Sequence, residues 1–205
     1  MPATLKMITT RWRAEDPPGA AAGDREGSLM NVRERSWFAD PILATMKVVL
    51  VGAGMLPIPP VDYGAVEKHV WNLAKALTAR GHDVRIVNKV FGERSSAEYR
   101  FAFWARREVA REPWDVVHVH TPGVATIFAA MGPRRFVYTT HSRHWSGTSG
   151  AGEAFGHMLE KRAVENAAET IAVSKYVAQQ IDRPTHVIPN GVDVARYAPR
   201  WDART

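Results

Sequence analysis

Residues 46–88, MKVVLVGAGMLPIPPVDYGAVEKHVWNLAKALTARGHDVRIVN, decide the fold. Residues 48–51 form a continuous apolar run, which is typical of a strand covered on both faces of a parallel sheet. The loop that follows contains three prolines and cannot be helical. After Gly64, which we expect to mark a solvent-open helix N-terminus, apolar residues recur at helical spacing. Gly81 then stands where a helix C′ glycine belongs, and residues 83–87 predict a second strand.

The same alternation of apolar runs and amphipathic segments continues through the rest of the chain. We expect helices over residues 95–111, 123–131, 154–168 and 175–181, and strands over residues 114–119, 135–140, 170–173 and 186–188. Ser174 is placed to cap the last of these helices. The pattern predicts an α/β fold, a doubly wound parallel sheet with helices on both faces.

Composition limits the class of protein. The 205 residues are 45% hydrophobic, enough to bury one core, and no apolar run approaches the ~18 residues of a membrane-spanning helix. The absence of cysteine excludes a disulfide scaffold and fits a reducing cytoplasm. The net charge of +6 suits phosphorylated ligands or an anionic membrane surface, and it equally suits a role in solubility alone. We expect no nucleic-acid partner.

Residues 1–45 differ from the rest of the chain. They mix acidic and basic side chains with a PPGAAAG stretch, and they contain neither a secretory apolar core nor the composition of a transit peptide. They are predicted to be a disordered N-terminal extension. Met46 stands directly before the first strand, where translation could begin.

Polar residues follow the predicted strands, at the edge of a parallel sheet where ligands bind. The first predicted helix begins at the same edge, at Gly64, Ala65 and Glu67. The polar residues and this helix start together suit a ligand that carries phosphate, because free N–H groups and the helix dipole favour an anion. The polar residues are His118, His120, His141, Ser174, Asn190, Gly191 and Asp193.

A dinucleotide-binding site is one alternative interpretation, and it carries less weight. Gly52 and Gly54 begin a dinucleotide-binding fingerprint, but Pro57 replaces its third glycine and the second strand ends in Asn88 rather than an acidic residue. This argues against NAD.

The histidines also allow a metal interpretation. His118 and His120 share one face of a strand and could bind zinc, but no third ligand stands at a convincing spacing, so we expect no metal. His69 and His82 flank a helix, where a surface or packing role is expected. His141 follows an apolar strand, a position that slightly favours function.

The predicted helix over residues 95–111 interleaves aromatic residues with arginines. It indicates either a surface that faces a membrane or acceptor, or a helix with one core face and one solvated face.

Five stretches resemble, in order, landmarks of the retaining GT-B glycosyltransferases of family 4. They are PIPPVDYGAVEKHVWNLAKALTARGHDV, DVVHVHTP, VYTTHSRH, KRAVENAAETIAVSKYV and VIPNGVD. The resemblance covers about residues 46–198. It implies a Rossmann-like acceptor-side domain over residues 46–193, one half of a GT-B fold. It also implies transfer of a sugar from a nucleotide-diphosphate sugar to an acceptor, with retention of configuration and without a cofactor.

The resemblance implies a role for individual residues. Gly64 and Ala65 would approach the donor phosphates through backbone N–H groups, although Ala65 replaces the second glycine of the family's loop. Glu67 would occupy the loop's acidic position. His141 would be the active-site histidine beside the reacting sugar, with His120 nearby.

The C-terminal part of the matching sequence indicates how the domains are organised. Ser174 would lie near the cleft, Asn190, Gly191 and Asp193 would begin the interdomain connection, and residues 194–205 would be a linker stub. The family's donor-binding domain would be missing, which implies a fragment, a truncated frame or one subunit of a split enzyme. The expected partners are a nucleotide-diphosphate sugar, a saccharide or lipid-linked acceptor, and the missing domain or subunit. The alternative is a non-catalytic domain that binds a sugar or lipid-linked acceptor, or a subunit of a split transferase. The expected location is the cytoplasm, with peripheral contact at the inner face of the membrane.

Overall fold

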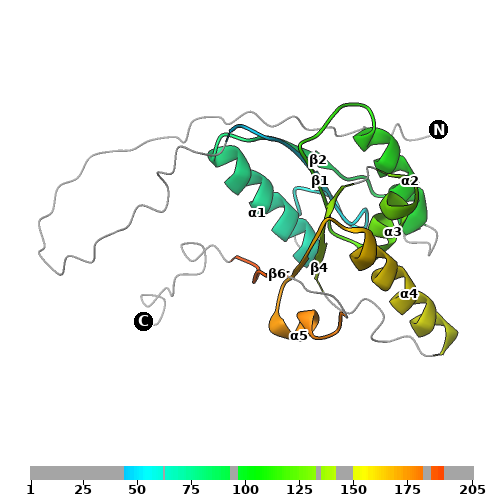
Figure 1. Ribbon diagram of the computed structural model, residues 1–205. Helices are drawn as coiled ribbons and strands as arrows, with labels where there is room; N and C mark the ends of the chain where they lie inside the picture. The colour runs from blue at the N-terminus through cyan, green and yellow to red at the C-terminus, as the bar shows by residue number, and fades with distance from the viewer. Residues whose placement is uncertain are drawn as a thin grey trace, which may run out of the picture.

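A parallel six-stranded sheet in the order β2-β1-β3-β4-β5-β6 forms the centre of the described chain (Figure 1). The computed structural model describes residues 44–61, 63–92, 97–132, 135–141, 150–181 and 186–191. Its strands are β1 (Lys47–Val51), β2 (Asp83–Val87), β3 (Val116–Val119), β4 (Val137–Thr140), β5 (Glu169–Ala172) and β6 (His186–Val187). Its helices are α1 (Ala65–Ala79), α2 (Ala97–Val109), α3 (Pro122–Met131), α4 (Ala151–Asn166) and α5 (Lys175–Ala178). The predicted doubly wound α/β fold is confirmed. The predictions for residues 1–43, Asp193 and residues 194–205 lie outside the described residues.

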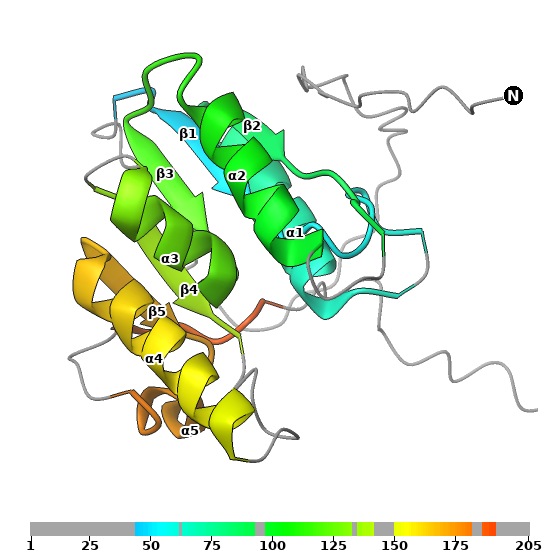
Figure 2. The same ribbon diagram turned by 90° about the vertical axis from the view of Figure 1, so that its right-hand side faces the viewer.

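Helices cover both faces of the sheet (Figures 1 and 2). Val48 and Leu50 of β1 pack with Val70 of α1, whereas Val49 and Val51 belong to the core built with α2, α3 and α4. Successive side chains of β1 therefore point to opposite faces and are buried on both. This explains why the strand is apolar throughout rather than alternating.

The ends of the helices follow from local sequence. Gly81 has a φ of 86° directly after the C-cap of α1, a left-handed conformation that glycine adopts readily. The Ser174 hydroxyl accepts a hydrogen bond from the Val177 N–H at 3.1 Å, so the predicted cap of α5 is confirmed. α5 ends at Ala178, earlier than predicted, because residues 179 and 180 form a turn.

Asn88 fixes the loop between β1 and α1. Its Oδ1 accepts a hydrogen bond from the Gly54 N–H at 2.9 Å, and its Nδ2 donates to the Leu56 carbonyl, also at 2.9 Å. Asn88 comes directly after β2, which lies beside β1 in the sheet. One amide side chain thus holds the proline-containing loop at the edge where β1 ends.

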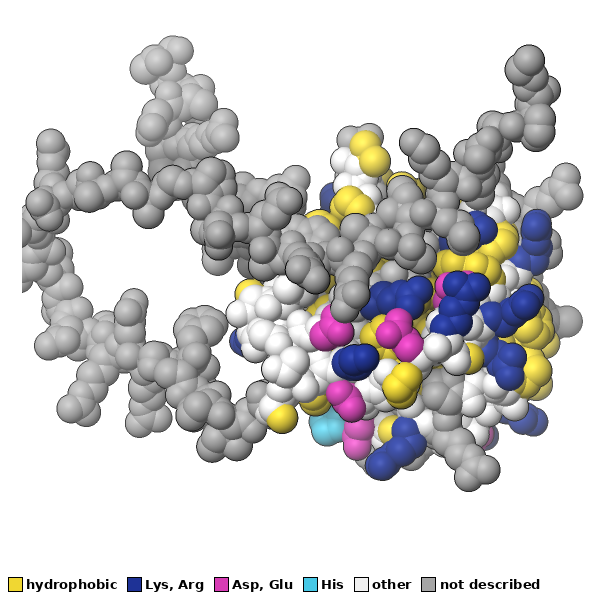
Figure 3. Space-filling model, turned by 90° about the horizontal axis from the view of Figure 1, so that it is seen from above, with side chains coloured by type: hydrophobic (Ala, Val, Ile, Leu, Met, Phe, Trp, Pro, Cys, Tyr) yellow, Lys and Arg dark blue, Asp and Glu magenta, His cyan; other side chains and the backbone are white. Residues whose placement is uncertain are grey.

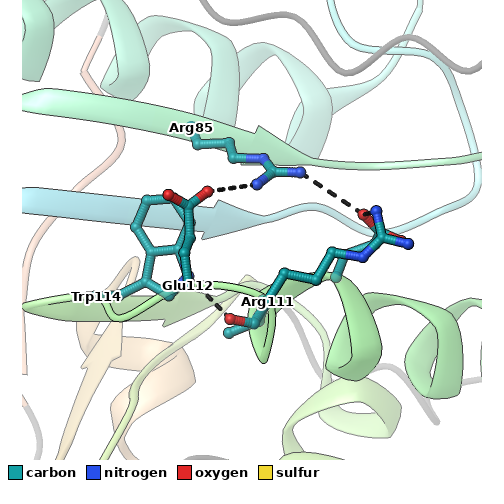
Figure 4. A network of polar contacts seen from close by, with 6 residues as sticks. Arg85, Arg111, Glu112 and Trp114 are labelled. Carbon is teal, nitrogen blue, oxygen red and sulfur yellow. Dashed lines mark hydrogen bonds and ion pairs between the residues drawn. The ribbon is translucent and has the colours of Figure 1, made fainter.

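A polar network ties β2 to the C-terminal end of α2 (Figure 4). Arg85 of β2 pairs with Glu112 at 2.6 Å and with the buried Glu108 at 3.6 Å. Arg111 pairs with Glu108 at 3.0 Å, and the Trp114 indole donates to a carbonyl near the end of α2 at 3.0 Å. The buried carboxylate is therefore paired with two guanidinium groups, as a buried charge requires.

The described surface is mixed in charge. In Figure 3, Lys and Arg side chains lie among acidic and hydrophobic ones. Within the described ranges, no helix has the length and apolar character needed to cross a membrane.

Candidate active site

The direction of the strand order reverses between β1 and β3, and this reversal marks the expected position of a ligand site. The chain passes from β1 through the Asn88-held loop into α1, and from β3 directly through His120 and Thr121 into α3. Because all strands are parallel, the residues that follow β1, β3, β4, β5 and β6 lie along one edge.

α1 begins at this edge, with Gly64 as its N-cap. Gly64 has a φ of 129°, at which an L side chain is strained, and a Cβ there would lie 2.7 Å from Oε2 of the buried Glu67, so this position favours glycine. The Gly64 carbonyl accepts the Lys68 N–H at 3.0 Å. The N–H groups of the first turn precede this bond, and these are the groups that an anion can bind.

The expectation that Gly64 itself is open to solvent is wrong. Gly64 is buried, because Leu56 and Glu67 lie against it. Ala65, the next residue, is exposed. An anion would therefore approach the helix at Ala65, while Gly64 makes the turn that places it.

Three histidines from different elements converge at the same edge. His120 follows β3 and His141 follows β4, and His120 Nδ1 lies 3.2 Å from His141 Nε2. The His69 ring on α1 lies with its centroid 5.5 Å from that of His120 and 4.9 Å from that of His141. The two histidines that the resemblance assigns to the active site are thus neighbours, and both lie beside His69 of α1, the helix that begins after Gly64.

His69 is the residue that the sequence analysis missed. The sequence predicts a surface or packing role for it, and the structure shows it half-buried and packed against the two rings of the candidate site. The available signal was the strand–helix connection itself, because it brings the first turns of α1 to the edge where His120 and His141 follow their strands.

His118 supports this cluster from within the sheet. Its ring stacks on His120 with a centroid distance of 4.3 Å, which confirms that the two share a face. Its Nε2 lies 2.7 Å from the Thr139 hydroxyl and so joins β3 to β4. The next residue, Thr140, donates to Glu160 of α4 at 2.9 Å and holds the chain directly before His141.

Burial keeps the imidazoles of His69, His118 and His120 neutral. It lowers the pKa of His69. Together with the nearby His69, burial lowers the pKa of His118 to about 4. Burial, and after it the neighbouring His118, His141 and His69, holds the pKa of His120 well below its ordinary value. At pH 7 each of these three rings therefore presents one N–H donor and one lone pair.

The remaining predicted site residues follow β5 and β6 along the same edge. The Ser174 hydroxyl is occupied as the cap of α5. Asn190 and Gly191 are exposed after β6, and Asp193 lies outside the described residues. The ring contacts group His120 and His141 with His69 on α1.

These features define a doubly wound α/β domain with its candidate ligand site where the strand order reverses. The family model of Glycosyltransferase Family 4 matches residues 66–196, and the chain belongs to this family. Spore coat protein SA of Bacillus subtilis (strain 168) is 25% identical over 177 residues, which are 76% of this chain and 45% of that protein. The chain thus spans somewhat less than half the length of this curated relative. The resemblance drawn from the five sequence stretches is confirmed at the level of the family.

Proposed function

We propose that this domain is the acceptor-side half of a glycosyltransferase. The complete enzyme transfers a sugar from a nucleotide-diphosphate sugar to an acceptor, with retention of configuration. The observation that carries the proposal is the convergence of His120, His141 and the N-terminal turn of α1 at one edge of a family 4 domain.

The start of α1 supplies the contact for the donor diphosphate. The exposed Ala65 begins a turn whose backbone N–H groups can donate to an anion, and the positive end of the helix dipole attracts the anion to them. The buried Glu67 and the glycine at position 64, with its φ of 129°, hold that turn in place. The methyl group of Ala65 narrows the approach but leaves the backbone donor in place.

His141 positions the donor sugar. As an imidazole it can accept a hydrogen bond from a sugar hydroxyl and hold the sugar for attack from the front face. His120 acts through His141, because the 3.2 Å contact between their ring nitrogens fixes the orientation of the second ring. Asn190, Gly191 and Asp193 begin the connection to the donor-binding domain, and Ser174 fixes the neighbouring part of the edge.

Transfer requires a second wall for this cleft. Holding donor and acceptor in a reactive orientation can contribute on the order of 7–11 kcal/mol, and this requires a closed site. A helix N-terminus with a few histidines would hold a diphosphate only weakly, with a Kd of roughly 1 mM, near −4 kcal/mol. We therefore expect residues 1–205 alone to bind donor weakly and to transfer no sugar.

The test measures nucleoside diphosphate release and glycosylated product for residues 1–205, alone and after fusion to a family 4 donor-binding domain. Activity should appear only in the fusion. There, His141→Ala should lower kcat much more than it changes KM for the acceptor, because the lost contact is made in the transition state. The control is His186→Ala, whose exposed ring pairs with Glu169 far along the sheet edge. Steady turnover by the isolated chain, or full turnover by the His141 variant, would contradict the proposal. Saccharide binding without transfer in the fusion would favour the non-catalytic alternative.

A second candidate role is peripheral contact with an anionic membrane, through α2. A surface groove beside this helix is lined by Phe91, Arg100, Phe103 and Trp104, among other residues. Phe103 is 47% exposed, and the Lys89 ammonium lies 5.2 Å from the Phe91 ring centroid. Phe101 on the opposite side of the helix is fully buried. α2 thus combines a core face, as one of the two sequence interpretations expected, with a face of arginine and aromatic side chains that suits an acidic lipid surface.

Vesicle co-sedimentation tests this second role. Binding to phosphatidylserine vesicles should exceed binding to phosphatidylcholine vesicles and should fall with salt. Replacing Arg100 and Arg107 with Gln should abolish the difference. Replacing the exposed Lys161 and Arg162 of α4 removes the same charge and should leave it unchanged. If both double variants lose the same amount of binding to phosphatidylserine vesicles, the preference comes from the net charge of the protein and not from α2.

A further inference from the structure

The three-histidine cluster has the composition of a metal site. His69, His120 and His141 each offer one ring nitrogen, and these three nitrogens all lie within 4.8 Å of one another. Neutral imidazole nitrogens are preferred ligands of zinc and of the neighbouring late first-row divalent metals. The sequence pairs His118 with His120 on one strand face but does not reveal that α1 brings His69 to this edge, so no metal is expected from the sequence.

The distances suit a common metal ion. Ligands about 2.0–2.1 Å from a tetrahedral zinc lie about 3.3–3.4 Å from one another. His120 Nδ1 and His141 Nε2 are 3.2 Å apart, which is this separation almost without adjustment. Since the third nitrogen lies within 4.8 Å of the others, a shift of the His69 ring nitrogen by roughly 1–2 Å would complete the set. His69 is only half-buried, so its ring has room to turn.

Packing alone does not account for a histidine at position 120. The residue is fully buried, and its Nε2 has no hydrogen-bond partner among the described residues. A buried polar atom without a partner costs free energy, and an apolar side chain of similar size would avoid that cost. Such a residue in a native structure calls for a functional reason. Coordination through Nδ1, which faces His141, would give the ring such a reason, while Nε2 would keep the proton.

The surrounding residues hold two of the three ligands rigidly. His118 stacks on the His120 ring and is itself fixed by the Thr139 hydroxyl. The Thr140–Glu160 hydrogen bond fixes the chain directly before His141. A tetrahedral ion bound by three protein ligands keeps its fourth position for water or for a ligand in the cleft.

We infer that His69, His120 and His141 form a binding site for one divalent transition-metal ion of the zinc type. The site goes beyond the proposed transfer reaction, which is expected to need no metal. The neutral His141 ring has one nitrogen lone pair, so binding of the ion and acceptance of a hydrogen bond from a sugar hydroxyl exclude each other at this residue. Its three ligands come from α1 and from the ends of β3 and β4, so it forms only in the folded domain.

The experiment uses untagged residues 1–205, stripped of metal with a chelator and dialysed. Co²⁺ is titrated while its visible ligand-field bands are recorded, and Zn²⁺ is then added as a competitor. We expect one ion per chain, a Kd in the micromolar range or below, and the spectrum of four-coordinate Co²⁺. X-ray absorption of the zinc form should count three imidazole nitrogens at about 2.0 Å.

Variants assign the ligands. His69→Gln and His141→Gln should each weaken binding by at least about 100-fold, since even loss of a residue behind a ligand costs 10–100-fold. The matched control is His186→Gln, a 63% exposed histidine outside the cluster, which should bind as the wild type does. Circular dichroism checks that each variant is folded, and His120 is not replaced because it is fully buried.

Three results would overturn the inference. They are a wild-type chain that binds no stoichiometric Co²⁺ or Zn²⁺, fewer than three imidazoles around the zinc, and folded His69 and His141 variants with unchanged affinity. The first would reduce the 3.2 Å contact to an ordinary hydrogen bond. If the variants fail to fold, the imidazole count on the wild-type protein decides. None of these results bears on transfer by the fusion enzyme, so the inference and the proposed function can fail separately.

Discussion

Asn88→Ala should destabilise the domain by loosening the loop between β1 and α1. The wild-type side chain makes two hydrogen bonds of 2.9 Å, one to the Gly54 N–H and one to the Leu56 carbonyl. A buried group that loses its partner costs about 1–3 kcal/mol, and two such groups would cost about 2–6 kcal/mol. Asn88 is only half-buried, so water can replace part of the loss. We expect a fall of about 2 kcal/mol in the free energy of unfolding, which corresponds to ~4–8 °C in Tm.

Urea unfolding at pH 7 measures the change, and hydrogen exchange reports where it occurs. The Gly54 amide should lose protection in the variant. Asn88→Asp, which keeps the acceptor for Gly54 but places a second oxygen opposite the Leu56 carbonyl, isolates the second bond. The control is Asn72→Ala, an exposed asparagine on α1. An Asn88→Ala variant within about 0.5 kcal/mol of the wild type, the range of ordinary surface substitutions, would refute the role of this residue.

Three further predictions concern single residues. Gly64→Ala should cost about 1–3 kcal/mol from its φ of 129° alone and more from the contact with Glu67. In urea unfolding, the loss in the free energy of unfolding should be larger for Gly64→Ala than for Gly81→Ala, because φ at Gly81 is 86° but a Cβ there meets nothing within 4 Å. Equal losses would show that the contact with Glu67 costs nothing. Ser174→Ala should lower the free energy of unfolding by about 1 kcal/mol through loss of the α5 cap, and no change would show that the 3.1 Å bond adds nothing. Glu98 has its pKa raised by burial, against the opposing effect of the Gly123 N–H, so the folded state holds this proton more tightly than the unfolded state. Its contribution to stability is therefore present at low pH and is lost as pH rises through the folded-state pKa. Glu98→Gln should gain stability relative to wild type between pH 4 and pH 7, and a difference independent of pH would contradict this.

Features determined by neighbouring residues could be predicted from the sequence. The apolar run of β1, the helical spacing of α1 and the C′ position of Gly81 each depend on a few residues, and the structure agrees at all three. Likewise, the Ser174 cap depends on a residue three positions away. The five family stretches also identified the family correctly.

Features determined by distant residues could not be predicted in the same way. Asn88 served in the sequence analysis only to argue against a dinucleotide site, because its hydrogen bonds reach 32 and 34 residues back along the chain. For His69 the sequence indicates only a surface or packing role, because helical periodicity does not reveal which neighbouring elements face each turn. The burial of Gly64 depends on Leu56 and Glu67, whose side chains meet only after the loop has folded.

The origin of the histidine cluster in separate strand–helix units has a consequence for folding kinetics. Its members follow β3 and β4 or lie on α1, and even the closest pair in sequence is 21 residues apart. Parallel pairing of strands over such separations requires costly loop closure before the contacts form, which makes it slow. The three rings can therefore meet only after α1 has docked and β3 and β4 have paired. A probe that senses their proximity during refolding will report the docking of α1 and the pairing of β3 with β4, and not the initial collapse.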